Sequence, residues 1–63
     1  MPRVTIQMFE GRTIEQKRAL VEGVTKVIVD TCKAPPENVT ILIQEMARDN
    51  YSKAGVLVCD AQK

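Results

Sequence analysis

Apolar and polar residues alternate at the start of the chain. Positions 4, 6 and 8 are apolar (Val, Ile and Met) and positions 3, 5 and 7 are polar, the period of two that is typical of a strand whose faces meet different surroundings. Pro2 suits the first position of such a strand, because proline cannot donate a hydrogen bond to a β-ladder. Gly11 is a turn signal. We therefore predict a strand between Pro2 and Gly11.

A helical repeat follows this strand. Thr13 and Gln16 have the spacing of a capping box, in which each side chain bonds the backbone amide of the other residue. Pro35 and Pro36 stop the helix, because proline lacks the amide that a helix interior uses and disfavours the α region at the residue before it. We predict a helix of about twenty residues with one apolar core face. The residues predicted for that face are Leu20, Val21, Val24, Val27, Ile28 and Thr31.

Residues 39–46 alternate again and predict a second strand. Its apolar side chains are Val39, Ile41 and Ile43 on one face and Leu42 and Met46 on the other. A strand, a helix and a second strand form a βαβ unit, whose right-handed crossover makes the two strands parallel neighbours. The predicted fold class is therefore α/β, a short βαβ unit in a single domain that covers residues 1–63.

One helix covers only one face of this sheet, whereas parallel sheets are normally covered on both faces. Leu42, Met46 and Phe9 are predicted on the uncovered face. A chain of this size also buries only about 60% of its unfolded surface, and small folds need a disulfide, a metal or self-association. We therefore predict a homo-oligomer. Residues 56–58 are expected to form a strand or an arm of a C-terminal hairpin that pairs with a neighbouring subunit's sheet.

Charge and cysteine content narrow the choice of partners. Nine basic and eight acidic side chains give a formal net charge of +1 with interspersed signs, which argues against a nucleic-acid partner. Two cysteines, Cys32 and Cys59, without any histidine argue against a zinc site. A disulfide between them is the alternative to two free thiols. Without a signal peptide or an apolar run long enough to cross a bilayer, we expect a cytoplasmic protein with reduced thiols and no membrane partner.

The candidate chemistry lies at Pro2. An initiator methionine that precedes proline is normally removed, and Pro2 would then carry a free secondary amine. An α-amino group titrates near about 7.7–8.0, and burial or a nearby cation lowers that pKa and leaves the amine unprotonated. Such an amine can act as a general base. The alternative is a structural proline, because proline is common at the second position.

Several short motifs share their spacing over nearly the whole chain: Pro2 before a strand, Glu10-Gly11-Arg12, Glu15-Gln16-Lys17, Ala34-Pro35, Val39, Glu45-Met46-Ala47, Tyr51 and Gly55. This set resembles the 4-oxalocrotonate tautomerase family from end to end. The resemblance implies the small tautomerase βαβ fold, assembled as a hexamer (a trimer of dimers), and no cofactor. It also implies that Pro2, freed of Met1, is the catalytic base.

The resemblance assigns roles to four further residues. Arg12 matches the arginine that binds a carboxylate of the substrate. Phe9 and Tyr51 stand in the apolar wall of the site, where the family has an aliphatic residue and a phenylalanine. Thr40 stands where well-studied members carry a second arginine that polarises the 2-oxo group, and its neutral hydroxyl lacks that charge.

The uncharged residue at position 40 leaves two interpretations open. Either Arg3, Arg48, Lys53 or a backbone amide supplies the missing positive charge, or the preferred substrate differs from the classical dicarboxylate. Arg12 itself can come from a neighbouring subunit, in which case activity requires the assembled ring.

The predicted function is cofactor-independent keto–enol tautomerisation of a 2-hydroxy-dienoate or an enolpyruvate, that is, a small unsaturated or 2-oxo carboxylic acid. Two alternatives stay open. In the first, the chain is a noncatalytic oligomer that binds small carboxylates. In the second, the same fold catalyses hydration, dehalogenation or decarboxylation of an unsaturated acid. The state of Met1 separates the noncatalytic interpretation from the others, because a peptide-bonded Pro2 has no basic nitrogen.

Overall fold

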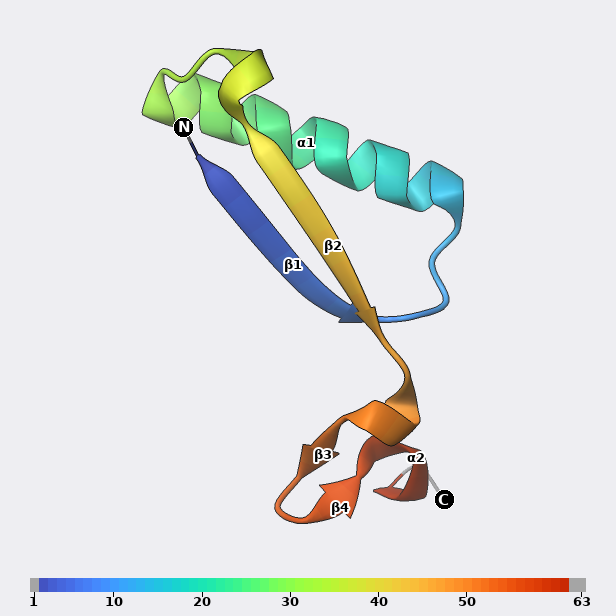
Figure 1. Ribbon diagram of the computed structural model, residues 1–63. Coiled ribbons are helices and arrows are strands. Elements are labelled where there is room, and N and C mark those ends of the chain that lie inside the picture. The colour runs from blue at the N-terminus through green and yellow to red at the C-terminus, as the bar shows by residue number, and fades with distance from the viewer. Residues whose placement is uncertain (1, 62–63) are drawn as a thin grey trace.

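A parallel two-stranded sheet with one long helix across its face forms the larger part of the molecule (Figure 1). The computed structural model describes residues 2–61. The elements are, in chain order, β1 (Arg3–Phe9), α1 (Ile14–Cys32), a 3-10 helix (Pro36–Asn38), β2 (Thr40–Met46), a second 3-10 helix (Arg48–Asn50), β3 (Ser52–Lys53), β4 (Val56–Leu57) and α2 (Val58–Ala61). β1 and β2 are parallel neighbours. The predicted βαβ unit is therefore confirmed.

The β1–β2 ladder runs in register from the pair Arg3 and Thr40 to the pair Phe9 and Met46. Positions 4, 6 and 8 of β1 and positions 41 and 43 of β2 are half-buried on the face toward α1, and the positions between them are exposed. On the exposed face the side chain of Gln7 donates a hydrogen bond to that of Gln44 at 3.0 Å. The alternation in the sequence thus assigned the two faces of β1 correctly.

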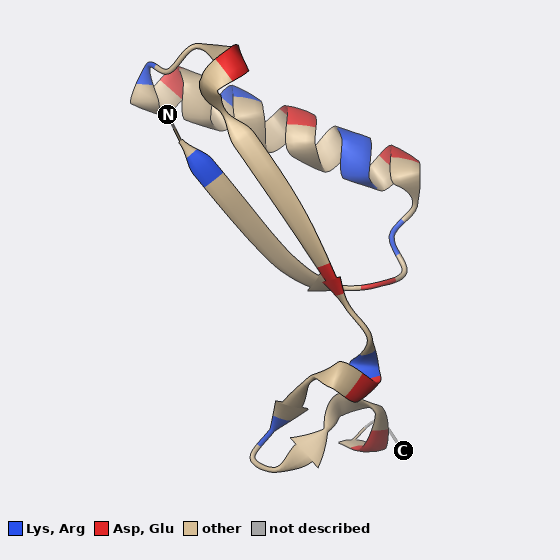
Figure 2. Cartoon of the chain, in the orientation of Figure 1, with Lys and Arg blue, Asp and Glu red and all other residues tan. Residues whose placement is uncertain are grey.

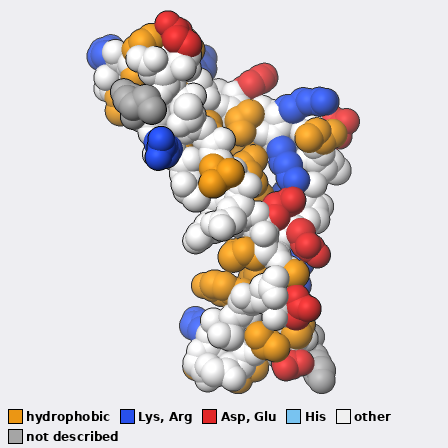
Figure 3. All heavy atoms as spheres, in the orientation of Figure 1, with side chains coloured by type: hydrophobic (Ala, Val, Ile, Leu, Met, Phe, Trp, Pro, Cys, Tyr) orange, Lys and Arg blue, Asp and Glu red, His pale blue; other side chains and the backbone are white. Residues whose placement is uncertain are grey.

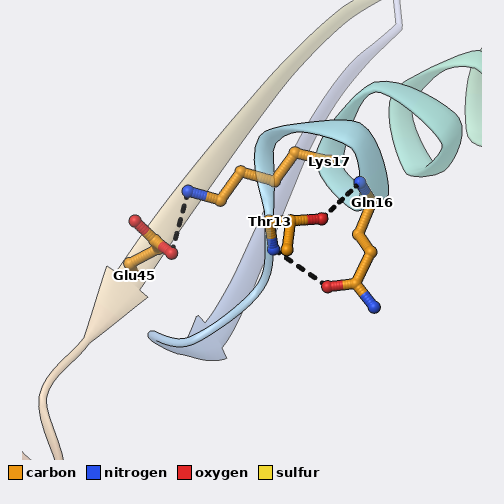
Figure 4. A network of polar contacts seen from close by, with 4 residues as sticks. All are labelled: Thr13, Gln16, Lys17 and Glu45. Carbon is orange, nitrogen blue, oxygen red and sulfur yellow. Dashed lines mark hydrogen bonds and ion pairs between the residues drawn. The ribbon is translucent and has the colours of Figure 1, made fainter.

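The predicted capping box begins α1 (Figure 4). The backbone N–H of Gln16 donates to Thr13 Oγ1 at 3.1 Å, and the backbone N–H of Thr13 donates to Gln16 Oε1 at 2.9 Å. One residue further along, Lys17 Nζ lies 2.9 Å from a carboxylate oxygen of Glu45. Because Glu45 belongs to β2, this ion pair ties the first turn of the helix to the far end of the sheet.

The helix ends slightly before the prolines that were predicted to stop it. Its last residue is Cys32, and Lys33 takes a left-handed conformation with a φ of 57° while its N–H donates to the carbonyl of Val29. A left-handed residue is a common way to end a helix. Pro35 and Pro36 then lie outside it, as the proline argument requires.

Two members of the predicted apolar face of α1 do not pack on the sheet. Val27 is 60% exposed, and Thr31 is exposed with its hydroxyl donating to the carbonyl of Val27 at 2.7 Å. Ile28 is half-buried, and neighbouring helical residues point about 100° apart, so Val27 lies on the flank of the helix. The assignment of these two residues to the core was wrong, because the apolar stripe is wider than the contact with a two-stranded sheet.

The C-terminal segment forms the predicted hairpin. β3 and β4 are antiparallel, and the turn between them uses Ala54 and Gly55, both with positive φ. The apolar run at residues 56–58 therefore begins as a strand, which pairs with Ser52–Lys53 of the same chain, and ends as the first residue of α2. Pairing of this run with another subunit's sheet stays a prediction.

This hairpin projects away from the βαβ unit (Figure 1), and apolar side chains lie open on the surface of both parts (Figure 3). None of the residues 2–61 is fully buried, and Leu42 on the open face of the sheet is 59% exposed. The radius of gyration is 15.1 Å, against roughly 11 Å for a compact domain of this length. Much apolar surface thus lies open along the chain.

Charges and thiols lie at the surface. Basic and acidic residues are interspersed along α1, whereas the strands carry charge only near their ends (Figure 2). Cys32 and Cys59 are both free and exposed, so the two-thiol alternative holds in this structure. Within residues 2–61, no helix has both the length and the apolar character needed to cross a membrane.

Candidate active site

Pro2 lies at the head of the sheet, where the ladder holds it in place. Its side chain is half-buried, and its carbonyl oxygen accepts a hydrogen bond from the backbone N–H of Thr40 at 3.1 Å. Thr40 is the register partner of Arg3, so these two exposed side chains lie next to each other on the same face. The start of the sheet therefore brings together Pro2, Arg3 and Thr40.

Phe9 and Tyr51 meet at the other end of the sheet. Their ring centroids are 5.6 Å apart, and the rings are nearly perpendicular, with an interplanar angle of 81°. Edge-to-face contact is a favourable geometry for an aromatic pair. The sequence predicted that these two residues share one wall, and the structure brings them into contact.

Arg48 completes this aromatic group. Its guanidinium carbon lies 4.9 Å from the centroid of the Phe9 ring, within the range of a cation–π interaction. Sequence reasoning considered Arg48 only as one of several sources of charge and did not predict the stacking on Phe9. The positions of the two residues could have indicated this contact, because Arg48 follows the end of β2 by two residues and Phe9 is the last residue of β1, the parallel neighbour of β2.

Arg12 lies in the connection between β1 and α1. Gly11 precedes it with a φ of 125°, an angle that residues other than glycine rarely adopt. Thr13, the N-cap of α1, follows it. The connection is therefore fixed on both sides of Arg12. Arg12 is exposed and leaves the sheet at the same end as Phe9.

The predicted site residues fall into two groups at opposite ends of the sheet. Pro2 and Thr40 lie at the start, and Phe9, Arg12 and Tyr51 lie at or beyond the end. Seven residue steps of a strand separate Pro2 from Phe9, which corresponds to roughly 23 Å. One chain by itself does not bring Pro2 close to Arg12.

The two groups differ in what they can do chemically. The start of the sheet offers the hydroxyl of Thr40, the guanidinium of Arg3 and the nitrogen of Pro2, which is basic only where Met1 has been removed. The far end offers the Arg48 guanidinium at the Phe9 and Tyr51 pair and Arg12 in the adjoining connection, a set suited to a planar carboxylate with an unsaturated chain. Lys53, another candidate for the missing charge, is exposed on β3 in the projecting hairpin.

Comparison with known proteins gives a consistent result over the whole chain. The family described as tautomerase enzyme matches residues 2–61. The 2-hydroxymuconate tautomerase of Bacillus subtilis is 47% identical over 62 residues, which is 98% of this chain and 100% of that protein. The 2-hydroxymuconate tautomerase of Pseudomonas putida is 45% identical over 56 residues, 89% of each chain.

Solved structures share the fold. The crystal structure of YwhB, a homologue of 4-oxalocrotonate tautomerase, superimposes with a TM-score of 0.89 at 47% identity and covers 94% of this chain and 97% of that one. A 4-oxalocrotonate tautomerase isozyme from Methylibium petroleiphilum gives a TM-score of 0.90 at 38% identity and covers 97% of this chain and 95% of that one. The projecting hairpin is therefore part of a shared fold.

Proposed function

The chain belongs to the tautomerase family, whose members are isomerases, and we propose that it interconverts the enol and keto forms of a small 2-hydroxy-dienoate or enolpyruvate without a cofactor. Pro2 is the general base, after removal of Met1, which lies outside the described residues. The observation that carries the proposal is the fixed position of Pro2 at the head of β1, with its carbonyl held by Thr40. A base must be held within reach of the proton that it moves.

The chemistry is a relay of one proton. The neutral secondary amine of Pro2 accepts the hydroxyl proton of the enol, and the resulting ammonium returns a proton to a carbon of the conjugated chain. The hydroxyl oxygen becomes the 2-oxo group, so atoms and charge balance. An amine that titrates near about 7.7–8.0 changes protonation state readily at neutral pH, as such a relay requires.

Arg12 binds a carboxylate of the substrate and draws electron density toward it. Phe9 and Tyr51 form an apolar wall that favours the neutral amine, because burial penalises a charged group. The hydroxyl of Thr40 donates one neutral hydrogen bond toward the 2-oxygen. This division of roles needs an amine from one end of the sheet and a guanidinium from the other.

The functional unit is a homo-oligomer, for which we propose a hexamer built as a trimer of dimers. Three features support assembly: no fully buried residue within 2–61, an open sheet face, and a radius of gyration of 15.1 Å. Together these features leave apolar surface exposed, and a second copy can cover it. The separation of Pro2 from Arg12 supports it independently.

The test is the Pro2→Ala variant, assayed for ketonisation of phenylenolpyruvate and 2-hydroxymuconate beside the parent. Mass spectrometry of the parent is expected to show loss of Met1. We expect the variant to be slower by about a hundredfold or more, the usual range for a positioned base.

Pro35→Ala is the matched control, because it removes the same ring from a turn outside the sheet, and it should keep the parent rate. Circular dichroism and gel filtration must show that all three proteins fold and assemble alike. A Pro2→Ala variant as fast as the parent, or an active protein that retains Met1, would contradict the proposal.

A further inference from the structure

Arg48 is a half-buried cation whose charge is not neutralised by the part of the chain described. Within residues 2–61 the one ion pair joins Lys17 to Glu45, and Arg48 takes part in no side-chain hydrogen bond. Glu45 is therefore committed elsewhere, and the neighbouring carboxylates of Glu10 and Asp49 are exposed and do not reach Arg48. Partial burial of a guanidinium without a charged partner costs free energy. The Arg48 guanidinium is therefore available to bind an anion.

The contact with Phe9 leaves the N–H donors of Arg48 available. Within residues 2–61 the Arg48 guanidinium makes no side-chain hydrogen bond, and its five N–H donors lie in the plane of the group. The 4.9 Å contact with Phe9 holds the guanidinium, and Tyr51 holds Phe9 from the side. Arg48 is thus held at Phe9 before any ligand arrives, and its free donors can form a forked pair of bonds to a carboxylate.

Arg12 and Arg48 leave the sheet at the same end. Phe9 and Met46 are paired in the register, and because the strands are parallel, the connections that carry the two arginines both begin there. One carboxylate needs only one guanidinium. One guanidinium at Phe9 and a second in the adjoining connection fit a molecule with an anionic group at each end of an apolar chain.

We propose that Arg48 binds the second carboxylate of an unsaturated dicarboxylate, while Arg12 binds the first. The inference rests on the proposed function and adds to it a residue that determines specificity for a second carboxylate. Arg3 differs in its expected effect: it lies beside Thr40 at the start of the sheet, where it would act near the reacting oxygen of any substrate. The contribution of Arg48, in contrast, depends on the second carboxylate.

The kinetic test compares Arg48→Met with the parent on two substrates. Methionine keeps a stem that can contact Phe9 but removes the charge. For 2-hydroxymuconate, which has two carboxylates, we expect kcat/KM to fall about tenfold to a hundredfold through KM, the range for a lost charge-assisted hydrogen bond. For phenylenolpyruvate, which has one, we expect little change. Arg48→Lys should recover part of the loss, and Arg18→Met, at an exposed position of α1, is the matched control.

A binding test keeps this inference separate from the proposed function. Calorimetry with muconate and sorbate compares the same unsaturated six-carbon chain with two carboxylates and with one, and neither undergoes the reaction. Arg48→Met should weaken muconate binding about tenfold or more and leave sorbate binding unchanged. Equal losses for both acids, or no loss for muconate, would overturn the role of Arg48. A Pro2→Ala variant with full activity would instead overturn the base and leave this binding result standing.

Discussion

The two ends of the β1–β2 sheet carry different chemistry. At the start, Pro2 and Thr40 are joined by a backbone hydrogen bond, and side-chain chemistry is sparse. At the far end, Phe9, Arg48 and Tyr51 form a stacked group next to the connection that carries Arg12. A strand of seven residues holds the ends apart. The chain therefore contains every part of the proposed site without assembling it.

This separation would give the proposed oligomer a chemical role in addition to a structural one. Two copies with antiparallel strands bring the start of one sheet close to the end of the other. In such an assembly the proposed base of one copy, Pro2, would meet the proposed carboxylate-binding arginines of its neighbour. Each copy contributes to two sites, and a free single chain is expected to be inactive.

The largest expected effect comes from mixing two defective chains. Pro2→Ala alone should be slower by about a hundredfold or more, and Arg12→Ala by about tenfold or more. When the two variants are unfolded, mixed and refolded together, some sites combine an intact Pro2 with an intact Arg12. We expect the mixture to turn over 2-hydroxymuconate well above the sum of the separate variants.

The control mixture combines Pro2→Ala with a chain that carries both substitutions. It contains no intact base and should recover nothing. If the first mixture also recovers nothing although gel filtration shows mixed oligomers, the two ends of the sheet do not meet between copies.

A smaller effect is expected from Gly11→Ala, which disturbs only the far end. Gly11 has a φ of 125°, and a Cβ atom added to it would meet no heavy atom within 4 Å, so the cost is backbone strain of about 1–3 kcal/mol without a clash. Urea unfolding at fixed protein concentration measures it. KM should rise because Arg12 is displaced.

Gly23→Ala is the matched control for this substitution. Gly23 is helical and has equally free surroundings, so alanine should stabilise the protein by about 0.5–1 kcal/mol. A Gly11→Ala variant as stable as the parent would show that the connection has other conformations available, and Arg12 would then not be held by it.

The smallest effect is expected from Lys17→Met, which removes the ion pair between α1 and the far end of β2. Both side chains keep part of their solvent exposure, 26% for Lys17 and 35% for Glu45, so the free energy of unfolding should fall by only about 0.5 kcal/mol. Lys26→Met, at an exposed position of α1, should change it less. High salt should remove the difference between the two variants. A loss several times larger would mean that Glu45 positions the sheet end.

The parts of the fold that could be predicted were those with a local cause. The capping box at Thr13, the turn at Gly11 and the strand alternation each depend on residues a few positions apart, and all three are confirmed. Val27 could not be placed correctly, because a helical period shows which side of a helix is apolar but not how wide the surface is that covers it.

The site was predicted residue by residue but not as an arrangement. The resemblance named Pro2, Arg12 and Tyr51 from their positions in the sequence, and their distribution over two sheet ends follows only from the register. The stacking of Arg48 on Phe9 joins residues that are far apart in the sequence, and no local pattern encodes it. Contacts of this kind depend on where a strand ends and which neighbour it pairs with.

The ladder uses the carbonyl oxygen of Pro2 and makes no demand on its nitrogen. We therefore expect the βαβ unit to fold whether or not an aminopeptidase has already removed Met1. In the proposed oligomer, we expect an untrimmed copy to contribute its arginines to the sites of trimmed neighbours. Removal of Met1 would then set the number of active sites in each oligomer and leave the architecture of the oligomer unchanged.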